Sequence, residues 1–321
     1  MKKKYFFILL IILFVLPFIG PELIKFDSVL NSGSQDYFIF WNLRVPRIIF
    51  SFLLGGILTL GGLIFQSIFK NDLATPYTLG VASGASFGTV IAIHLNITFV
   101  FFIFNSQYIL SFLGALLSVF FILTIIKIKK DFSISLILLA GIAINFLFSS
   151  LILFFQYVMN YSKLGSAVRW MMGSISIYEY RKIWMILPFY FILFFNSYYY
   201  KYQLDIMFLG DELALSKGVD VYSLRKKLFF ITSIIIAMAV SLSGPIGFVG
   251  LIIPHLLKLV IGKIHKHLIY GAVIFGGVFL ALTDTIARTI IAPAEMPVGI
   301  ITSIMGVPFF LYLLIRKKRY G

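Results

Sequence analysis

Runs of about twenty apolar residues recur along this 321-residue chain, separated only by short polar stretches. A helix needs a run of that length to cross the hydrocarbon core of a bilayer. Backbone groups in lipid must find their hydrogen bonds within the protein, which favours helices. We therefore predict an all-α polytopic membrane protein with about ten transmembrane helices. The predicted spans are residues 5–21, 46–69, 78–95, 100–126, 133–158, 181–200, 224–243, 246–262, 267–291 and 298–315.

The composition agrees with a membrane protein and narrows the chemistry. Only 12% of the residues are charged and 60% are hydrophobic, well outside the range of soluble domains. The absence of cysteine excludes disulfides, cysteine-ligated zinc, iron–sulfur clusters and a thiol nucleophile. No linker interrupts the spans, so residues 1–321 are predicted to form one transmembrane domain. The basic N-terminus could open a signal peptide, but no small-x-small cleavage site follows, so we interpret it as an uncleaved span.

The basic residues predict the orientation of the chain. With the N-terminus inside, the cytoplasmic segments hold 19 of the 27 Lys and Arg residues and the outer segments hold 8. The positive-inside rule therefore places both termini in the cytoplasm. The net charge of +15 is thus a topology signal, and a nucleic-acid partner need not be invoked. Residues 164–172 are too short to span and are predicted to form an interfacial or partly re-entrant helix.

The longest polar interruption, residues 200–227, is the predicted cytoplasmic loop, with its core at about 201–227. Within it Asp211 could cap a short helix, DELALSK, that ends at Gly218 in the left-handed C′ position. Asp220 or Ser223 could begin the next helix. Such a short helix is not stable in water alone, so its own domain or a partner must hold it. The alternative is a solvated connection between two spans.

Small residues and helix breakers predict where spans pack closely or bend. Gly80, Gly84 and Gly88 recur every four residues, a pattern along which another helix backbone can approach. Gly244, Pro245 and Gly247 should break the helix where two spans meet, where irregular backbone can line a cavity. The full set of predicted packing or pathway residues is Gln66, Asn71, Pro76, Gly80, Gly84, Gly88, Gly244, Pro245, Gly247 and Pro254.

Three arginines, Arg44, Arg47 and Arg288, fall near the predicted outer face. Their planar side chains suit docking to acidic patches of an external binding protein. The alternatives are snorkelling to lipid headgroups and, for Arg288, an intrahelical pair with Asp284 one turn earlier.

Catalysis and metal binding are not supported by the sequence. No Walker A motif occurs, and no Ser–His–Asp arrangement can be proposed from the spacing. The four histidines are scattered: His255 is predicted to make a structural hydrogen bond, His94 lies at an outer helix end, and His265 and His267 are predicted to be solvated. We predict no metal site, no cofactor in this chain and no enzymatic activity.

Five motifs occur in one order: RVPR at 44–47, GG-x₃-Q with NDLATP and LGVASGA at 61–85, GDELALSKGV at 210–219, GPIGFVGLIIPH at 244–255, and D-x₃-R with EMPVGI and GVPFFLYLL at 284–314. By these motifs and their order, the chain resembles the FecCD family of ABC-transporter permeases from about Arg44 to Arg316. Lys258 stands where the family usually has arginine, which keeps the charge.

This resemblance implies the type II ABC importer permease fold, working as a homodimer or with a similar permease. It implies import of an iron–siderophore, haem or cobalamin chelate across a bacterial cytoplasmic membrane. A cytoplasmic ATPase dimer would use ATP and contact the loop, and a periplasmic or lipid-anchored substrate-binding protein would dock outside. The implied ATPase contacts are Leu209, Gly210, Asp211, Glu212, Ala214, Leu215 and Gly218. The alternative from another class is a self-sufficient secondary transporter or channel, which usually carries ionisable residues at mid-membrane. Here Asp284 is the one carboxylate near a span interior, and its expected partner is Arg288.

Overall fold

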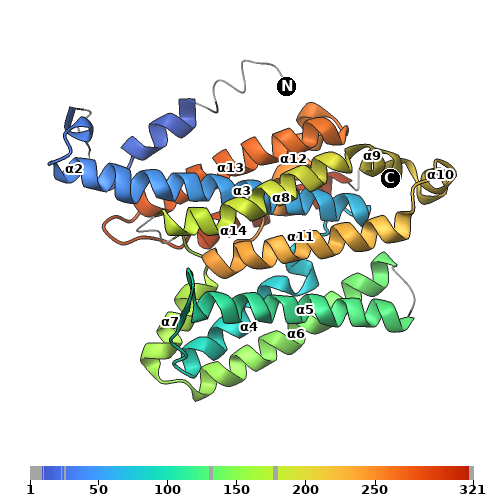
Figure 1. The fold of residues 1–321 in the computed structure, drawn as a ribbon, viewed down its shortest axis with the longest axis horizontal. Coiled ribbons are helices and arrows are strands. Elements are labelled where there is room, and N and C mark those ends of the chain that lie inside the picture. Colours follow the sequence, from blue (N-terminus) through green and yellow to red (C-terminus); the bar gives the residue numbers. More distant parts are fainter. Residues whose placement is uncertain are drawn as a thin grey trace.

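The computed structural model describes residues 9, 11–22, 24, 27–129, 133–175 and 180–317, which form an almost entirely helical protein (Figure 1). Residues 11–15 are helical and lead into η1 (Leu16–Phe18). The further elements are η2 (Asp27–Leu30), α2 (Gln35–Phe38), the π-helical η3 (Ile39–Arg44), α3 (Val45–Ile68), η4 (Pro76–Leu79), α4 (Val81–His94), β1 (Val100–Phe101), β2 (Phe104–Asn105), α5 (Ser106–Lys129), α6 (Ile134–Val158), α7 (Tyr161–Met171), α8 (Arg181–Tyr199), α9 (Lys201–Leu209), α10 (Asp211–Ser216), α11 (Val221–Ser243), α12 (Val249–Ile261), α13 (His265–Thr289) and α14 (Val298–Lys317).

Five helices of the described residues are long and apolar enough to cross a bilayer: Gln35–Ile68, α5, α6, α11 and α13. A sixth span results if α8 and α9, which meet at 55°, are one bent element. Shorter apolar helices, α4, α12 and Val298–Tyr312 of α14, occupy three further predicted spans. Each predicted span from the second to the tenth therefore contains a helix. The first lies partly outside the described residues, and the fourth begins with a small hairpin, β1–β2, rather than a helix.

The second predicted span begins earlier than expected. Ser34 caps α2 by accepting a hydrogen bond from the Tyr37 amide, and α2, η3 and α3 continue as one helix of 34 residues from Gln35 to Ile68. Arg44 and Arg47 therefore lie within this helix and not before its first turn. The predicted start at residue 46 was wrong because Ser34 caps a helix that begins at Gln35, and the mostly apolar residues 37–43 continue it.

Two sets of four helices share one pattern, in which only the second helix is short. The first set, α3 to α6, has 24, 14, 24 and 25 residues, and the second, α11 to α14, has 23, 13, 25 and 20. In each set a proline-containing break and a residue with positive φ, Gly80 or Phe248, precede the short second helix. Phe65 and Phe69 near the end of α3 pack on Phe229 near the start of α11, so these helices run in opposite directions. This arrangement agrees with the inverted repeat that the sequence suggested without resolving.

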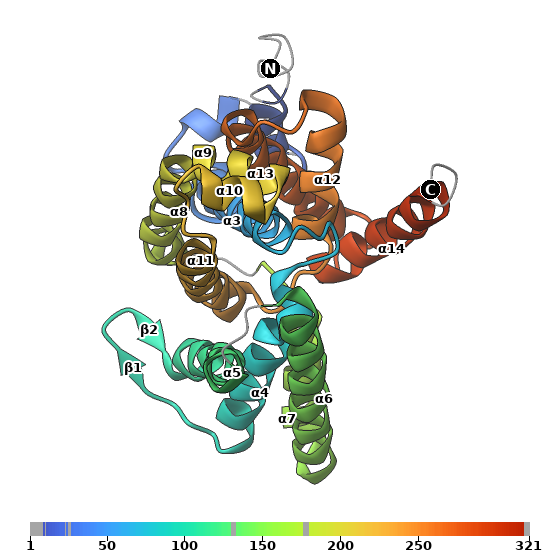
Figure 2. The same cartoon turned by 90° about the vertical axis from the view of Figure 1, so that its right-hand side faces the viewer.

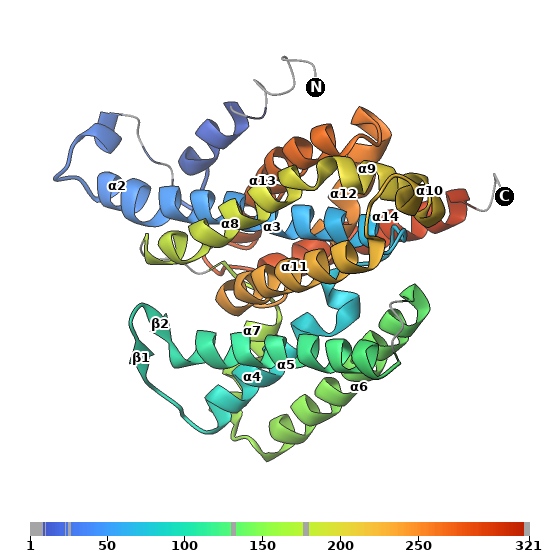
Figure 3. The ribbon, with the colours of Figure 1, turned by 45° about the vertical axis from the view of Figure 1, so that its right-hand side comes forward.

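Helix α3 is the centre of the larger of two lobes. Its glycines allow backbone contact with the second set: Gly55 lies against Gly276 of α13, and Gly62 against Gly250 of α12. Helices α4 to α7 form the second lobe, which packs on the first mainly through α11 (Figures 2 and 3). The two lobes are also joined by the Ile246 amide, which donates a hydrogen bond to the Tyr77 hydroxyl. We call the end of the molecule that carries α9 and α10 the inner end, and the opposite end the outer end.

Candidate functional site

The loop at the inner end folds into two short helices, α9 and α10, separated by Gly210. Gly210, whose positive φ of 142° favours glycine, is the N-cap of α10, and Asp211 is its first helical residue. The prediction that Asp211 caps this helix is therefore wrong. Asp220, by contrast, does cap the next helix: its carboxylate accepts a hydrogen bond from the Ser223 amide at 3.0 Å.

Gly218 ends α10 as predicted, with φ of 78°. Its amide donates to the Leu215 carbonyl and the Val219 amide donates to the Ala214 carbonyl, each at 2.9 Å. This pair of bonds is the Schellman motif, which satisfies carbonyls that a helix end leaves free. A residue with positive φ, which favours glycine, is thus required where the chain turns from α10 toward α11.

Asp211 ties α10 to two long helices. Its carboxylate accepts hydrogen bonds from Lys70, just beyond the end of α3, at 2.6 Å and from Arg225 of α11 at 2.9 Å. Burial acts to raise the pKa of Asp211, but the Lys70 hydrogen bond and the charges of Arg225 and Lys70 outweigh it and lower the pKa. The carboxylate stays charged at neutral pH, and these ion pairs fix the loop relative to the spans.

The outer side of the loop presents apolar side chains to solvent. Leu209, Leu213 and Leu215 are 66%, 51% and 60% exposed, with Glu212 beside them. We call these four residues the loop surface. Ala214, one of the predicted contacts, is fully buried because it packs toward the protein, and Leu213 takes its place on the surface. Gly210 and Asp211 are half-buried, and Gly218 is exposed. A cavity of about 550 Å³ lies beside Gly218, lined by residues of α9, the turn after α10 and α11.

The predicted packing glycines of α4 meet α5 directly. A side chain at Gly84 would collide with the Gly114 carbonyl, and one at Gly88 with the Leu110 carbonyl. Gly80 has φ of 78° and begins α4. Gly244 has φ of 71° and ends α11, where it lies against Gly173 and the Trp170 carbonyl. The predicted helix break at this position is confirmed, although Gly247 faces open space and Pro245 instead approaches Gly173.

The remaining predicted pathway residues occupy structural positions at the inner end. Gln66 accepts a hydrogen bond from Lys258 at 2.8 Å, and Lys258 also pairs with Asp72 at 2.9 Å. Asn71 accepts from the Leu73 amide and so shapes the turn after α3. Pro76 opens η4, and Pro254 is buried inside α12. Each of these residues therefore has a packing or turn function whether or not it also lines a pathway.

The three outer arginines are bonded within the chain. Arg44, 4% exposed, donates to the carbonyls of Pro17, Phe18 and Glu22. Arg288, also 4% exposed, donates to the Leu16 carbonyl. A docking protein can bind only exposed guanidinium groups. The side chains of Arg44 and Arg288 would therefore have to break these hydrogen bonds before they could serve in docking. The N-terminal segment, which carries no motif, covers Arg44 and Arg288, and docking through the arginines stays a prediction.

Arg47 is the partner of Asp284, a position the sequence assigned to Arg288. Its Nε and Nη2 atoms lie 2.8 and 3.0 Å from the two carboxylate oxygens of Asp284, which is 1% exposed. Its Nη1 atom binds Glu295, 2.9 Å away in the exposed loop after α13. This bidentate pair joins α3 to α13 at the outer end.

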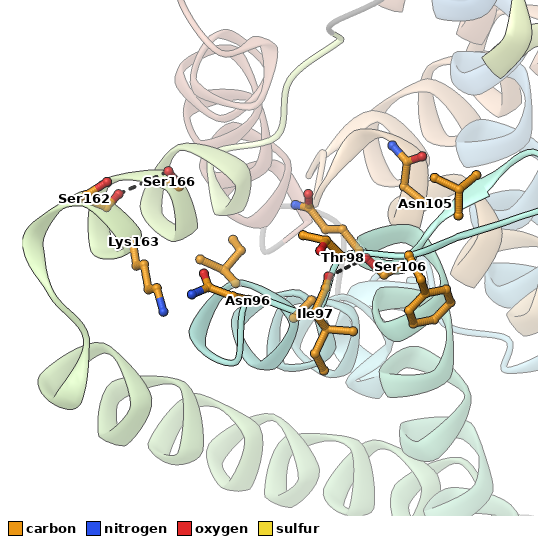
Figure 4. A pocket seen from close by; sticks show the side chains of 13 residues that line it. Asn96, Ile97, Thr98, Asn105, Ser106, Ser162, Lys163 and Ser166 are labelled. Atoms are coloured by element: carbon orange, nitrogen blue, oxygen red, sulfur yellow. Dashed lines mark hydrogen bonds between the residues drawn. The ribbon is translucent and has the colours of Figure 1, made fainter.

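A second cavity, of about 720 Å³, opens at the outer end between the end of α4, the β1–β2 hairpin and α7 (Figure 4). Its polar lining includes Asn96, Asn105 and Ser162. Lys163, the lysine of this lining, already donates to the His94 carbonyl at 2.8 Å. Lys163 is thus the charged residue of this lining, and one of its three N–H donors is already bonded within the chain.

Sequence reasoning also missed a polar cluster at the start of α13. His265, expected in solvent, is 2% exposed and contacts Asp205 of α9 and Ser67 of α3. Residues 67, 205 and 265 are too far apart in the chain for spacing to reveal them, and only packing brings them together. His255 contacts the Phe309 ring edge-on, 6.4 Å between centroids. Within the described residues no cluster of three potential metal ligands occurs.

Comparison with known proteins places the chain among ABC importer permeases. The family model of the FecCD transport family matches residues 8–316. The chain is 34% identical to the hemin transport system permease HmuU of Yersinia pestis, over 93% of this chain and 90% of that protein. It is also 34% identical to the iron(3+)-hydroxamate import permease FhuG of Bacillus subtilis, over 90% and 87% of the two chains.

A solved structure supports the same assignment at the level of the fold. It is described as an inward-facing conformation of a metal-chelate type ABC transporter, and it superposes with a TM-score of 0.83 at 29% identity over 98% of this chain and 99% of that one. The match covers both sets of four helices and the loop between them. The chain is therefore a multi-pass membrane permease that belongs to the FecCD transport family.

Proposed function

We propose that this chain imports a metal chelate, with an iron–siderophore as the first candidate and haem and cobalamin as the others. Relatives that carry hemin and iron(3+)-hydroxamate support this class of substrate. We further propose that the chain resides in a bacterial cytoplasmic membrane with both termini in the cytoplasm. It pairs with a second permease copy or a paralogue and receives substrate from an external binding protein.

The observation that carries the proposal is the attachment of the loop surface to the spans. The surface exposes three leucines on two short helices that could not stay folded alone. Asp211 fixes these helices to α3 and α11 through Lys70 and Arg225. A partner that moves the loop surface therefore also moves both repeats. We assign this surface as the contact with a cytoplasmic ATPase, since the sequence has no Walker A motif of its own.

The proposed function excludes catalysis in this chain and any resident cofactor. ATP would be bound and hydrolysed by the partner subunit. The substrate path would run through the weakly charged spans, where low affinity lets a bulky chelate pass. The alternative, a self-sufficient secondary transporter, requires an ionisable group free to exchange protons or ions at mid-membrane. Asp284 is instead held bidentately by Arg47.

The test is uptake by proteoliposomes that contain this permease, its ATPase subunit and its binding protein. Labelled ferric hydroxamate, hemin and cobalamin are supplied separately, each with ATP or with a non-hydrolysable analogue inside. We expect uptake of one chelate only when ATP can be hydrolysed. ATP-independent uptake by the permease alone would favour the secondary transporter.

A further inference from the structure

Three elements meet at His265, the first residue of α13. Its Nδ1 atom lies 2.7 Å from Oδ1 of Asp205 in α9, and its backbone amide donates to the same oxygen at 2.8 Å. Its Nε2 atom lies 2.7 Å from Oγ of Ser67 near the end of α3. Ser67 is itself buried, and its Oγ lies 2.7 Å from the Leu63 carbonyl. The ring therefore bridges α9 to the inner ends of α3 and α13.

The donors and acceptors around His265 decide which atoms of this bridge carry protons. A carboxylate only accepts, so the ring must donate from Nδ1 to Asp205. The Ser67 hydroxyl has one proton, which the Leu63 carbonyl can accept. If it does, Ser67 can only accept from His265, and both ring nitrogens carry protons. A neutral ring would take the hydroxyl proton at Nε2 and leave the Leu63 carbonyl without it. The three side-chain hydrogen bonds form together only with a charged imidazolium. Loss of its proton removes the bond from Ser67 to the Leu63 carbonyl, which keeps its backbone hydrogen bond within α3.

We propose that Asp205, His265 and Ser67 form a proton-dependent latch that holds α9 against α3 and α13. All three are positioning residues: none touches a substrate, and the latch acts by making the loop surface move together with both repeats. The inference rests on the proposed function for its role in transport, but the latch itself does not depend on it. Protonation of the ring strengthens the latch and deprotonation loosens it, because only the charged ring donates from both nitrogens.

The neighbouring charges are compatible with this assignment. The titratable group that faces the ring from α9 is Asp205. Burial acts to raise the pKa of Asp205, but the two hydrogen bonds from His265 and the charges of His265 and His267 outweigh it and lower the pKa. From α3 the facing group is the neutral Ser67. Lys258 of α12 is occupied by Gln66 and Asp72, and Lys263 lies over the Phe208 ring. Lys266 and His267 of α13 are exposed.

Asp, His and Ser also form the catalytic triads of hydrolases, but Asp205, His265 and Ser67 cannot act as a catalytic triad. A triad serine must present its oxygen to a substrate. The Ser67 oxygen is instead enclosed between the His265 ring and the Leu63 carbonyl. A structural latch accounts for the cluster without a reaction.

The first measurement uses the permease alone in lipid nanodiscs. Hydrogen exchange of the α9 amides is followed from pH 5.5 to 8, and each rate is divided by the intrinsic rate of the unstructured peptide at the same pH. The control is His267→Gln, a variant of the exposed neighbouring histidine. We expect the protection of α9 to fall as pH rises in the wild type and in His267→Gln. In His265→Gln and Asp205→Asn we expect exchange about tenfold or more faster at pH 5.5, with no pH dependence. Ser67→Ala removes one hydroxyl group and should reduce the protection of α9 by an intermediate amount. It replaces the other two variants if either of them fails to fold.

The second measurement uses the permease bound to its ATPase subunit. We expect His265→Gln to bind the ATPase within about twofold of wild type, because the loop surface is intact, yet to lose most of the permease-dependent change in ATP hydrolysis. A wild-type exchange profile that is flat with pH, or equal in His265→Gln and His267→Gln, would overturn the latch. Unaltered ATP hydrolysis in His265→Gln would overturn its role in transmission. Failure of the wild-type permease to bind any ATPase would instead refute the proposed function, and the exchange result would still decide the latch.

Discussion

The outer ion pair between Arg47 and Asp284 offers a decisive test of how the arginines work. Replacing Arg47 with methionine keeps the aliphatic volume but leaves the Asp284 carboxylate buried at 1% exposure without its bidentate partner. Removing one member of a buried pair costs about 3–5 kcal/mol. Two hydrogen bonds to charged groups, at about 1.5–3 kcal/mol each, give a similar sum.

Replacing both members should restore most of that loss. In Arg47→Met with Asp284→Leu the buried carboxylate is removed together with its bidentate partner, while Arg288 keeps its hydrogen bond to the Leu16 carbonyl. Such paired replacements are often neutral or stabilising. We therefore expect the single variant to melt roughly 6–10 °C below wild type, at on the order of 2 °C per kcal/mol, and the double variant to recover most of the difference. The assay is thermal unfolding of the purified permease in detergent, with Lys163→Met as the control for loss of an outer positive charge.

The docking interpretation predicts a different outcome. If Arg47 serves chiefly to bind an external protein, Arg47→Met should melt like wild type and lose affinity for that protein. A single variant as stable as wild type, or a double variant as unstable as the single one, would refute the structural reasoning.

Three further predictions concern packing, the loop and orientation. Gly88→Leu should separate α4 from α5, because its side chain would meet the Leu110 carbonyl, and so lower yield and melting temperature, whereas Gly165→Leu, at an open position, should not. Gly218→Val should reduce uptake and ATPase stimulation at normal expression, because a β-branched residue disfavours φ of 78°; normal uptake would make the loop a mere connector. In this cysteine-free chain, a cysteine at Ser216 should be labelled only from the cytoplasm and one at Ser162 only from outside; labelling of position 216 from outside would reverse the proposed orientation.

Much of this protein follows from local sequence. Apolar runs predict the helical segments because lipid forces backbone groups to bond within each segment. Gly218 and Gly244 predict chain reversals because their backbone angles are costly for other residues. The four-residue spacing of Gly84 and Gly88 predicts close helix contact because period and helical geometry coincide. Five motifs in order are enough to indicate the family before any coordinate is considered.

The partners of polar side chains depend on tertiary structure alone. Sequence proximity paired Asp284 with Arg288, but the helix packing brings Arg47, 237 positions away, into bidentate geometry. It placed Asp211 as a cap, but the fold offers Lys70 and Arg225 to its carboxylate. It left His265 in solvent, although α3 and α9 enclose it. Helix formation is a local matter of backbone bonding and side-chain period, whereas a buried charge must find whichever partner the packed helices bring within reach, and no spacing in the chain encodes that distance.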